Sequence, residues 1–206
     1  MARQPARLFV IAAPSGAGKT TLVKELVERK PGLRFSISYT TREKRVTEVE
    51  AKDYFFVPEA EFQKLEEKGE LLESALVFDN RYGTSRSQVE QHLSNGHHVI
   101  LEIDWQGAQQ VRRSKPDCIT IFILPPSRDQ LERRLRDRRT DSDTVIERRL
   151  NDALGDMSHW NEFDHVIIND DLTLAVTELE LVLNGRGETN RVGNESLRTR
   201  IEEIIR

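Results

Sequence analysis

Residues 8–21 read Leu-Phe-Val-Ile-Ala-Ala-Pro-Ser-Gly-Ala-Gly-Lys-Thr-Thr. The apolar run at the start of this stretch is typical of a buried parallel strand, in which hydrophobic residues follow one another without alternation. A loop of small residues, Pro14 to Gly18, comes next, and apolar residues then recur at helical spacing until Pro31-Gly32 ends the pattern. The stretch therefore predicts a strand, a glycine-rich loop and a helix in immediate succession.

This order of elements is the setting of a phosphate-binding P-loop. Gly16 and Gly18 allow the backbone to curl so that its N–H groups face phosphate oxygens, and the helix N-terminus adds unpaired donors. Lys19 would bridge the β- and γ-phosphates, and the Thr20 hydroxyl would ligate Mg²⁺. Ala13 stands where the usual pattern has glycine, and its methyl group is tolerable if φ is negative. A strand-turn-helix that binds no nucleotide is the alternative.

Composition narrows the class of protein. The chain has 206 residues, a formal net charge of −4 and a single cysteine, Cys118. The near balance of charge argues against a general nucleic-acid binder, and the sequence shows neither a membrane-length apolar run nor a signal peptide. One cysteine cannot form an internal disulfide, so we expect a cytoplasmic protein. The histidines lack metal-ligand spacing, so the expected metal is Mg²⁺ bound with a nucleotide.

Strands alternate with helices along most of the chain, which predicts an α/β fold with a doubly wound parallel sheet as its core. Ligands of such sheets bind at the carboxyl ends of the strands. Those ends are Pro14, Asp104, Pro125 and Asn169.

Between the first helix and the second core strand, short strands and turns predict a small inserted mixed α/β lobe. We expect strands over Arg34 to Tyr39 and Asp53 to Val57, and a turn over Asn80 to Thr84 that leads into another short strand. Two arginines, two tyrosines and hydroxyl groups in this lobe suit a second phosphate. Glu73 would accept two N–H bonds from one planar base edge, which guanine offers and adenine does not.

Two further groups of residues favour phosphoryl chemistry. Glu102 and Asp104 point the same way at a strand end, where a carboxylate would hold magnesium through water; capping of the next helix is the alternative. Arg134 and Arg138, four residues apart in an arginine-rich segment, would project together over a triphosphate. An RNA-binding helix is the competing interpretation, and it lacks interleaved aromatic residues.

Seven segments in order resemble guanylate kinases of the bacterial type, from about Arg7 to Leu183. They are Ala-Pro-Ser-Gly-Ala-Gly-Lys-Thr, Ser-Ile-Ser-Tyr-Thr-Thr-Arg, Asp-Tyr-Phe-Phe-Val, Tyr-Gly-Thr-Ser, Ile-Asp-Trp-Gln-Gly-Ala, Phe-Ile-Leu-Pro-Pro-Ser and Ile-Asn-Asp-Asp-Leu. The resemblance implies Mg²⁺-dependent, in-line phosphorylation of GMP by ATP to give ADP and GDP, which serves purine nucleotide recycling and GTP supply. It also implies activity on dGMP, and it leaves a homo-oligomer open.

The resemblance also implies a division of the chain and roles for single residues. A guanylate kinase domain would span 7–185, with its core at 7–34, 95–126 and 159–185, a GMP-binding lobe at 35–94 and a helical lid at 127–158. The residues implied to bind GMP are Ser38, Arg42, Arg45, Tyr54, Glu73, Tyr82, Thr84 and Asp104. Those implied to contact ATP are Ala13, Pro14, Ser15, Gly16, Ala17, Gly18, Lys19, Thr20, Thr21 and Asn169. The catalytic set is Lys19, Arg42, Arg134, Arg138 and Arg149.

The chain departs from the family pattern at several positions. Those outside the P-loop are Lys44 and Thr47, where Pro and Gly are usual, Ala51 for Gly, Glu102 for Asp and Arg139 for Gly. A scaffold domain that binds phosphopeptides without catalysis is one rival function, and a kinase for another nucleoside monophosphate is the other. The tail, 186–206, carries an apolar stripe that predicts a helix, which either docks on the core or forms an oligomer contact.

Overall fold

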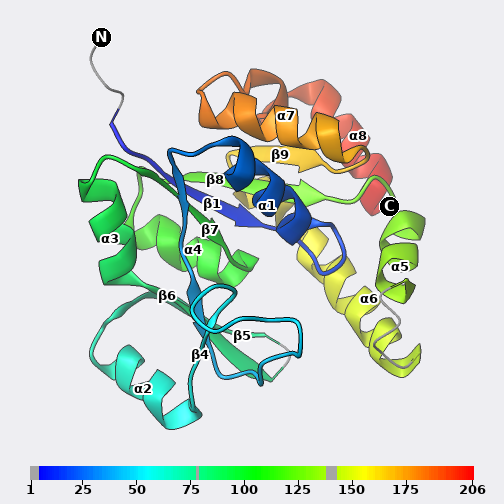
Figure 1. Ribbon diagram of the computed structural model, residues 1–206. Helices are drawn as coiled ribbons and strands as arrows, with labels where there is room; N and C mark the ends of the chain where they lie inside the picture. The colour runs from blue at the N-terminus through cyan, green and yellow to red at the C-terminus, as the bar shows by residue number, and fades with distance from the viewer. Residues whose placement is uncertain (1–4, 78, 138–142) are drawn as a thin grey trace. The chain divides into compact units, whose positions relative to one another are not determined.

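The computed structural model describes residues 5–77, 79–137 and 143–206 (Figure 1). The chain forms two compact units. The first unit contains the chain up to Val10 together with Pro31–Ile119. The second contains Ile11–Lys30 and Thr120–Arg206. No helix in the described ranges is both long enough and apolar enough to cross a bilayer.

Strands alternate with helices along much of the chain, as the sequence predicts, whereas β2 to β4 and β5 to β6 follow one another without a helix between them. The strands are β1 Leu8–Ala12, β2 Leu33–Phe35, β3 Ser38–Thr40, β4 Phe55–Phe56, β5 Leu71–Val77, β6 Asn80–Ser85, β7 His98–Glu102, β8 Ile119–Leu124 and β9 His165–Ile168. The helices are α1 Lys19–Arg29, α2 Glu59–Glu67, α3 Arg86–Ser94, α4 Trp105–Ser114, α5 Arg128–Arg136, α6 Asp143–Met157, α7 Leu172–Leu183 and α8 Glu195–Ile205, with 3₁₀ turns η1 Ser158–Glu162 and η2 Glu188–Asn190. A five-stranded sheet has the order β2-β7-β1-β8-β9, and a four-stranded sheet has the order β4-β3-β6-β5.

In the first unit, the four-stranded sheet is mixed. β3 and β5 both pair antiparallel with β6, whereas β4 pairs parallel with β3. β2 and β7 pair in parallel, with Arg34 opposite Val99, and helix α4 packs against β5. This unit therefore holds the inserted lobe that the sequence predicts, together with a pair of core strands.

In the second unit, β8 and β9 pair in parallel, and helix α7 packs against β9 and α1. The continuous apolar run of β8 is buried almost throughout, as expected for a strand covered on both faces. Phe122 is fully buried against Phe163, and a side chain of this size contributes about 1.5–3 kcal/mol on burial. Helix α8 buries Ile201 and Ile204 within the chain, so the tail docks on this unit.

Two element predictions in the lobe are wrong. The segment 34–39 is not one strand: β2 and β3 belong to different sheets, and the Gln88 side chain accepts a bond from the Ile37 N–H at the junction (3.1 Å). The alternation of side chains does not reveal this change of partner. The segment 80–84 is strand β6 rather than a turn, because the chain reverses earlier, at Asp79, where φ is 65°.

Candidate active site

The glycine-rich loop of the second unit joins β1 to α1. Gly16 and Gly18 have φ values of 89° and 91°, a conformation that costs other residues free energy, and Gly18 is the N-cap of α1. Lys19 and Thr20 occupy the first turn of that helix. Among described residues other than glycine, positive φ occurs at Ala51 and Asp79, so Ala13 lies outside the left-handed region. The loop thus leads into the N-terminus of α1, and the partial positive charge of a helix N-terminus favours an anion.

Two polar side chains hold this loop from neighbouring elements. The Asn169 amide donates to the Ala17 carbonyl at 2.8 Å, and Arg134 Nη1 donates to the same oxygen at 3.3 Å. Arg134 Nη2 donates to the Asn169 carbonyl at 2.9 Å. A Cβ atom at Gly18 would lie 2.4 Å from Asn169 Nδ2. Asn169 and Arg134 therefore reach the P-loop directly, and close packing demands glycine at position 18.

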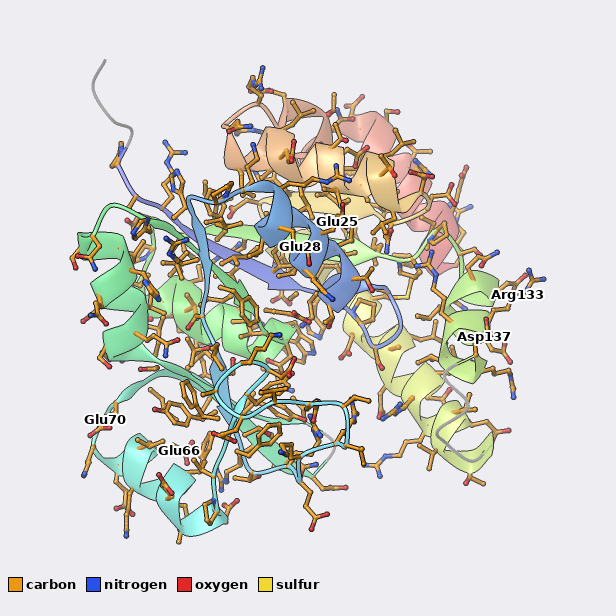
Figure 2. The ribbon with its side chains drawn as sticks, viewed as in Figure 1. Glu25, Glu28, Glu66, Glu70, Arg133 and Asp137 are labelled. Carbon is orange, nitrogen blue, oxygen red and sulfur yellow. The ribbon has the colours of Figure 1, made fainter. Side chains whose placement is uncertain are left out.

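The predicted lid arginines lie in three different situations. Arg134 turns toward the P-loop from α5, whereas its neighbour Arg133 is exposed and extends away from that helix (Figure 2). Arg149 lies on α6 in the same unit. Arg138, and with it the departure at Arg139, lies outside the described residues. Of the two arginines expected to project together, Arg134 is the one that the structure describes, and it lies against the loop.

In the first unit, three residues predicted to read a base lie side by side on adjacent strands. Ser38 of β3 is opposite Thr84 of β6, and Thr84 is opposite Glu73 of β5. The Thr84 hydroxyl donates to Glu73 Oε1 at 2.6 Å, and Glu73 is only 4% exposed. A register shift between Leu71 and Glu73 sets this pairing, as bulges commonly re-aim side chains near functional sites.

The N-terminus of α4 meets this group of residues. Asp104 is the N-cap of α4, and its Oδ1 accepts from the Gly107 N–H at 2.7 Å, so the capping interpretation holds for this carboxylate. A Cβ atom at Gly107 would lie 2.6 Å from Glu73 Oε2 and 3.1 Å from Asp104 Oδ1. Both carboxylates therefore converge on the space that glycine leaves at position 107, and the partial positive charge of the helix end offsets their charge.

The residues predicted to hold the second phosphate form another cluster in the first unit. The Arg42 guanidinium lies 5.5 Å from the Tyr54 ring and 5.7 Å from the Phe56 ring, and the Tyr54 and Tyr82 ring centroids are 5.9 Å apart. Arg45 is more exposed, and its Nη1 lies 3.9 Å from Glu48. Glu48, for which the sequence predicts no role, joins both arginines. Its Oε1 accepts from Arg42 Nη2 at 2.7 Å, and its Oε2 from the Arg45 N–H at 2.8 Å.

The electrostatics of this cluster suit an anion. Burial lowers the pKa of Arg42, but its interactions with Glu48 and Tyr82 outweigh burial, and the net pKa is raised. Burial would raise the pKa of Glu48, and its bonds to Arg42 and Arg45 reverse this, so the carboxylate stays ionised. Burial, followed by the charge of Glu102, raises the pKa of Tyr54 to about 12. Tyr54 thus keeps its proton near neutral pH, and its hydroxyl is able to donate a hydrogen bond.

Two of these positions carried a signal in the sequence. Glu48 follows Arg45 by three residues in a loop rich in charge, a spacing that allows one carboxylate to orient a nearby guanidinium. Gly107 stands inside the Asp-Trp-Gln-Gly segment, directly after a strand end, where backbone approach is expected. The departure at Ala51 has a visible consequence, because its φ of 59° is the left-handed conformation that glycine adopts more easily.

The metal-binding residues can be examined by the chemistry of their donors. No group of three or more His, Cys, Asp or Glu side chains gathers as a metal site in the described ranges. Thr20, an exposed residue, carries a hydroxyl in the first turn of α1. Magnesium bound to a nucleotide keeps several waters and needs only one or two protein oxygens beside the phosphates, so this donor set fits.

Comparison with known proteins covers nearly the whole chain. Residues 5–186 match the family model described as Guanylate kinase. A guanylate kinase of Methylococcus capsulatus is 48% identical over 198 residues, which are 96% of this chain and 95% of that protein. One of Aromatoleum aromaticum is 54% identical over 179 residues, 87% of this chain and 88% of its own. The crystal structure of guanylate kinase from Anaplasma phagocytophilum matches with a TM-score of 0.75 at 32% identity, covering 96% of this chain and 94% of that one.

Proposed function

The chain belongs to the guanylate kinase family and catalyses the ATP-dependent phosphorylation of GMP to GDP, and from this premise we propose which residues hold each nucleotide. The P-loop of the second unit binds ATP, and the lobe of the first unit binds GMP. The observation that carries the assignment is the buried Glu73 carboxylate, bonded to Thr84 and adjacent to Gly107. The two oxygens of this carboxylate suit the two N–H donors that the guanine edge presents.

ATP is held by the loop 13–18, by Lys19 and by the first turn of α1. The loop amides and the helix N-terminus surround the phosphates, and Lys19 adds the charge that the β- and γ-phosphates require. Arg134, anchored on Ala17 and Asn169, and Arg149 of α6 act on the transferred phosphoryl group. One arginine in this role is worth about 10³-fold or more in rate. Arg138 belongs to the same proposed set.

Magnesium completes the ATP site in this proposal. The Thr20 hydroxyl would hold it together with the phosphates, and Glu102 would act through water. The ion, when bound, neutralises charge that develops on the phosphate oxygens.

GMP is held by two groups of residues in the first unit. Its phosphate is bound by Arg42, Arg45, Tyr54 and Tyr82, with Glu48 orienting both arginines. Its base is read by Ser38, Glu73, Thr84 and Asp104. Because Asp104 Oδ1 already caps α4, we propose that its other oxygen faces the base.

The reaction is a direct in-line transfer, in which the GMP phosphate oxygen attacks the γ-phosphorus of ATP and ADP leaves. This chain's own residues bind, orient and neutralise; positioning and electrostatic stabilisation account for most catalysis of phosphoryl transfer. The division at 7–185 into core, lobe and lid, the cytoplasmic location and activity on dGMP remain part of the proposal. The single buried cysteine supports the location.

A coupled assay that offers ATP with each of GMP, AMP, CMP and UMP tests the assignment of the base. We expect GMP to be preferred over AMP by about 10⁴-fold in kcat/KM, because AMP leaves a buried carboxylate unsatisfied. In Glu73→Gln, an amide N–H₂ can face the donors of guanine, and KM for GMP should rise by about 10²-fold. The matched control is Glu61→Gln, an exposed position on α2. Comparable turnover of GMP and AMP by the unmodified protein would contradict the role of Glu73.

A further inference from the structure

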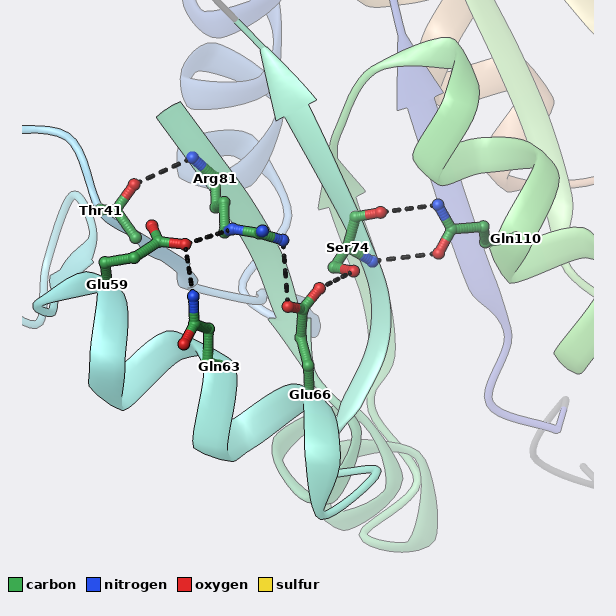
Figure 3. A network of polar contacts seen from close by, with 7 residues as sticks. All are labelled: Thr41, Glu59, Gln63, Glu66, Ser74, Arg81 and Gln110. Atoms are coloured by element: carbon green, nitrogen blue, oxygen red, sulfur yellow. Dashed lines mark hydrogen bonds and ion pairs between the residues drawn. The ribbon is translucent and has the colours of Figure 1, made fainter. Parts of the chain in front are cut away.

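The side chain of Gln110 on α4 makes a paired bond to the backbone of one residue in β5 (Figure 3). Gln110 Oε1 accepts from the Ser74 N–H at 3.1 Å, and Gln110 Nε2 donates to the Ser74 carbonyl at 2.6 Å. The carboxamide thus occupies both the donor and the acceptor of a single strand residue. A neighbouring strand would satisfy these groups in the same way.

The contact between Gln110 and Ser74 lies at an edge strand of the four-stranded sheet. β5 is the last strand of the order β4-β3-β6-β5, so among the described strands none pairs with the edge that faces away from β6 in that sheet. The strand also carries the register shift between Leu71 and Glu73. A bulged edge strand is free to twist or slip more than a central strand. Gln110 therefore fixes β5 one residue after the shift, next to Glu73.

Helix α4 also contacts the Glu73 side chain. Gly107 and Gln110 are three residues apart and lie on one face of the helix. The space at Gly107 receives Glu73 Oε2, while Gln110 holds the peptide of the following residue. Helix α4 thus contacts the Glu73 carboxylate at Gly107 and the backbone of the next residue, Ser74, through Gln110. Asp104, at the start of the same helix, lies beside that carboxylate.

We propose that Gln110 is a positioning residue for base selectivity, which sets the Glu73 carboxylate where it accepts from both N1–H and the 2-amino group of guanine. This inference rests on the proposed role of Glu73. Inosine 5′-monophosphate offers the N1–H group but has no 2-amino group. Displacement of Glu73 should therefore lower kcat/KM for GMP more than kcat/KM for inosine 5′-monophosphate.

The opposite side of Ser74 supplies a control. The Ser74 hydroxyl donates to Glu66 Oε1 at 2.6 Å, and Glu66 Oε2 accepts from Arg81 at 3.1 Å, so this branch ties β5 and β6 to α2 (Figure 3). Ser74→Ala removes the branch at β5 but keeps both backbone groups that Gln110 binds. Gln91→Ala, at an exposed site on α3, removes a carboxamide elsewhere in the same unit.

The experiment measures kcat/KM for GMP and for inosine 5′-monophosphate at saturating ATP, the KM for ATP and the unfolding temperature of the full chain. In Gln110→Ala, kcat/KM for GMP should fall by about 10–10²-fold. The ratio of kcat/KM for GMP to kcat/KM for inosine 5′-monophosphate should fall by about 10-fold. Gln110→Glu keeps the size of the side chain but loses the donor to the Ser74 carbonyl, so it should lower the ratio as well. KM for ATP should stay unchanged, and Ser74→Ala and Gln91→Ala should keep the ratio of the unmodified protein.

The inference is wrong if both Gln110 variants leave the ratio of the two kcat/KM values unchanged, whether or not they lower kcat/KM for both substrates by the same factor. If Gln110→Ala does not fold, the ratio measured for Gln110→Glu decides between these outcomes. Glu73→Gln separates this inference from its premise. If that variant keeps the ratio, the role of Glu73 fails; if it collapses the ratio while the Gln110 variants do not, the role of Gln110 alone fails.

Discussion

The P-loop and the group of residues proposed to read the base differ in how their parts are brought together. In the proposed function the P-loop binds phosphate through backbone amides of consecutive residues, and two glycines at positive φ shape the loop. The base-reading group brings together Ser38, Glu73 and Thr84 from three strands and Asp104 from the start of a helix. The first is written in one stretch of sequence, whereas the second exists only once strand register and a helix cap are in place. Local sequence encodes the first, and tertiary structure encodes the second.

Replacing Lys19 by Ala should have the largest effect, because it should disable the proposed ATP site and leave the proposed GMP site intact. The charge on the β- and γ-phosphates loses its partner, and we expect kcat to fall by about 10³-fold. GMP binding, measured by calorimetry without ATP, should be unchanged because its residues lie in the first unit. Lys24→Ala, an exposed lysine on the same helix, is the control. Loss of GMP affinity in Lys19→Ala would show that the two sites are not separable in this way.

The same difference decides how much was predictable from sequence. The strand, loop and helix around Gly16 and Gly18 are as predicted, because every signal for them is contiguous. The joining of 34–39 into one strand was wrong, since side-chain alternation is the same whether or not a strand changes sheets. The turn expected at 80–84 was wrong as well, because Gly83 is a strand residue here. It is buried, and a Cβ atom there would lie 2.8 Å from Leu71.

The candidate residues follow the same rule. The resemblance named Glu73 and Thr84, but only the register of β5 and β6 shows that they bond to each other. Gln110 could not have been found from sequence, since nothing in a helical glutamine indicates that it binds an edge strand. The roles of all these residues in binding and catalysis remain predictions.

A pair of glycine substitutions tests whether each site fails by itself. Gly107→Ala places a methyl group 2.6 Å from Glu73 Oε2, and KM for GMP should rise by about 10²-fold while KM for ATP stays constant. Gly18→Ala combines a φ of 91° with a methyl group 2.4 Å from Asn169 Nδ2, so KM for ATP should rise instead. Steady-state kinetics with each substrate varied would measure both.

Gly155→Ala is the control for this pair, because no described atom other than those of its chain neighbours and its own helix backbone lies within 4 Å of the added methyl group. It should leave both KM values unchanged. If Gly107→Ala and Gly18→Ala each raised both KM values equally, damage to one site would spread to the other, and the contrast between them would not hold.

The smallest expected effect is at Ala51. This alanine adopts the left-handed backbone conformation, which in the P-loop is adopted by glycines. Its φ is 59°, and its N–H donates to the Tyr54 carbonyl at 2.9 Å, so the strained residue lies next to the proposed phosphate-binding tyrosine. Ala51→Gly relieves about 1–2 kcal/mol of steric cost and gives back about 0.4–1 kcal/mol through the greater freedom of the unfolded chain. We expect a net gain of about 0.5–1 kcal/mol in the free energy of unfolding by urea, whereas Ala60→Gly in helix α2 should lose about 0.5–1 kcal/mol. Equal losses in the two variants would mean that the lobe accepts alanine in this conformation without strain, and the glycine usual at this position in the family would then need another explanation.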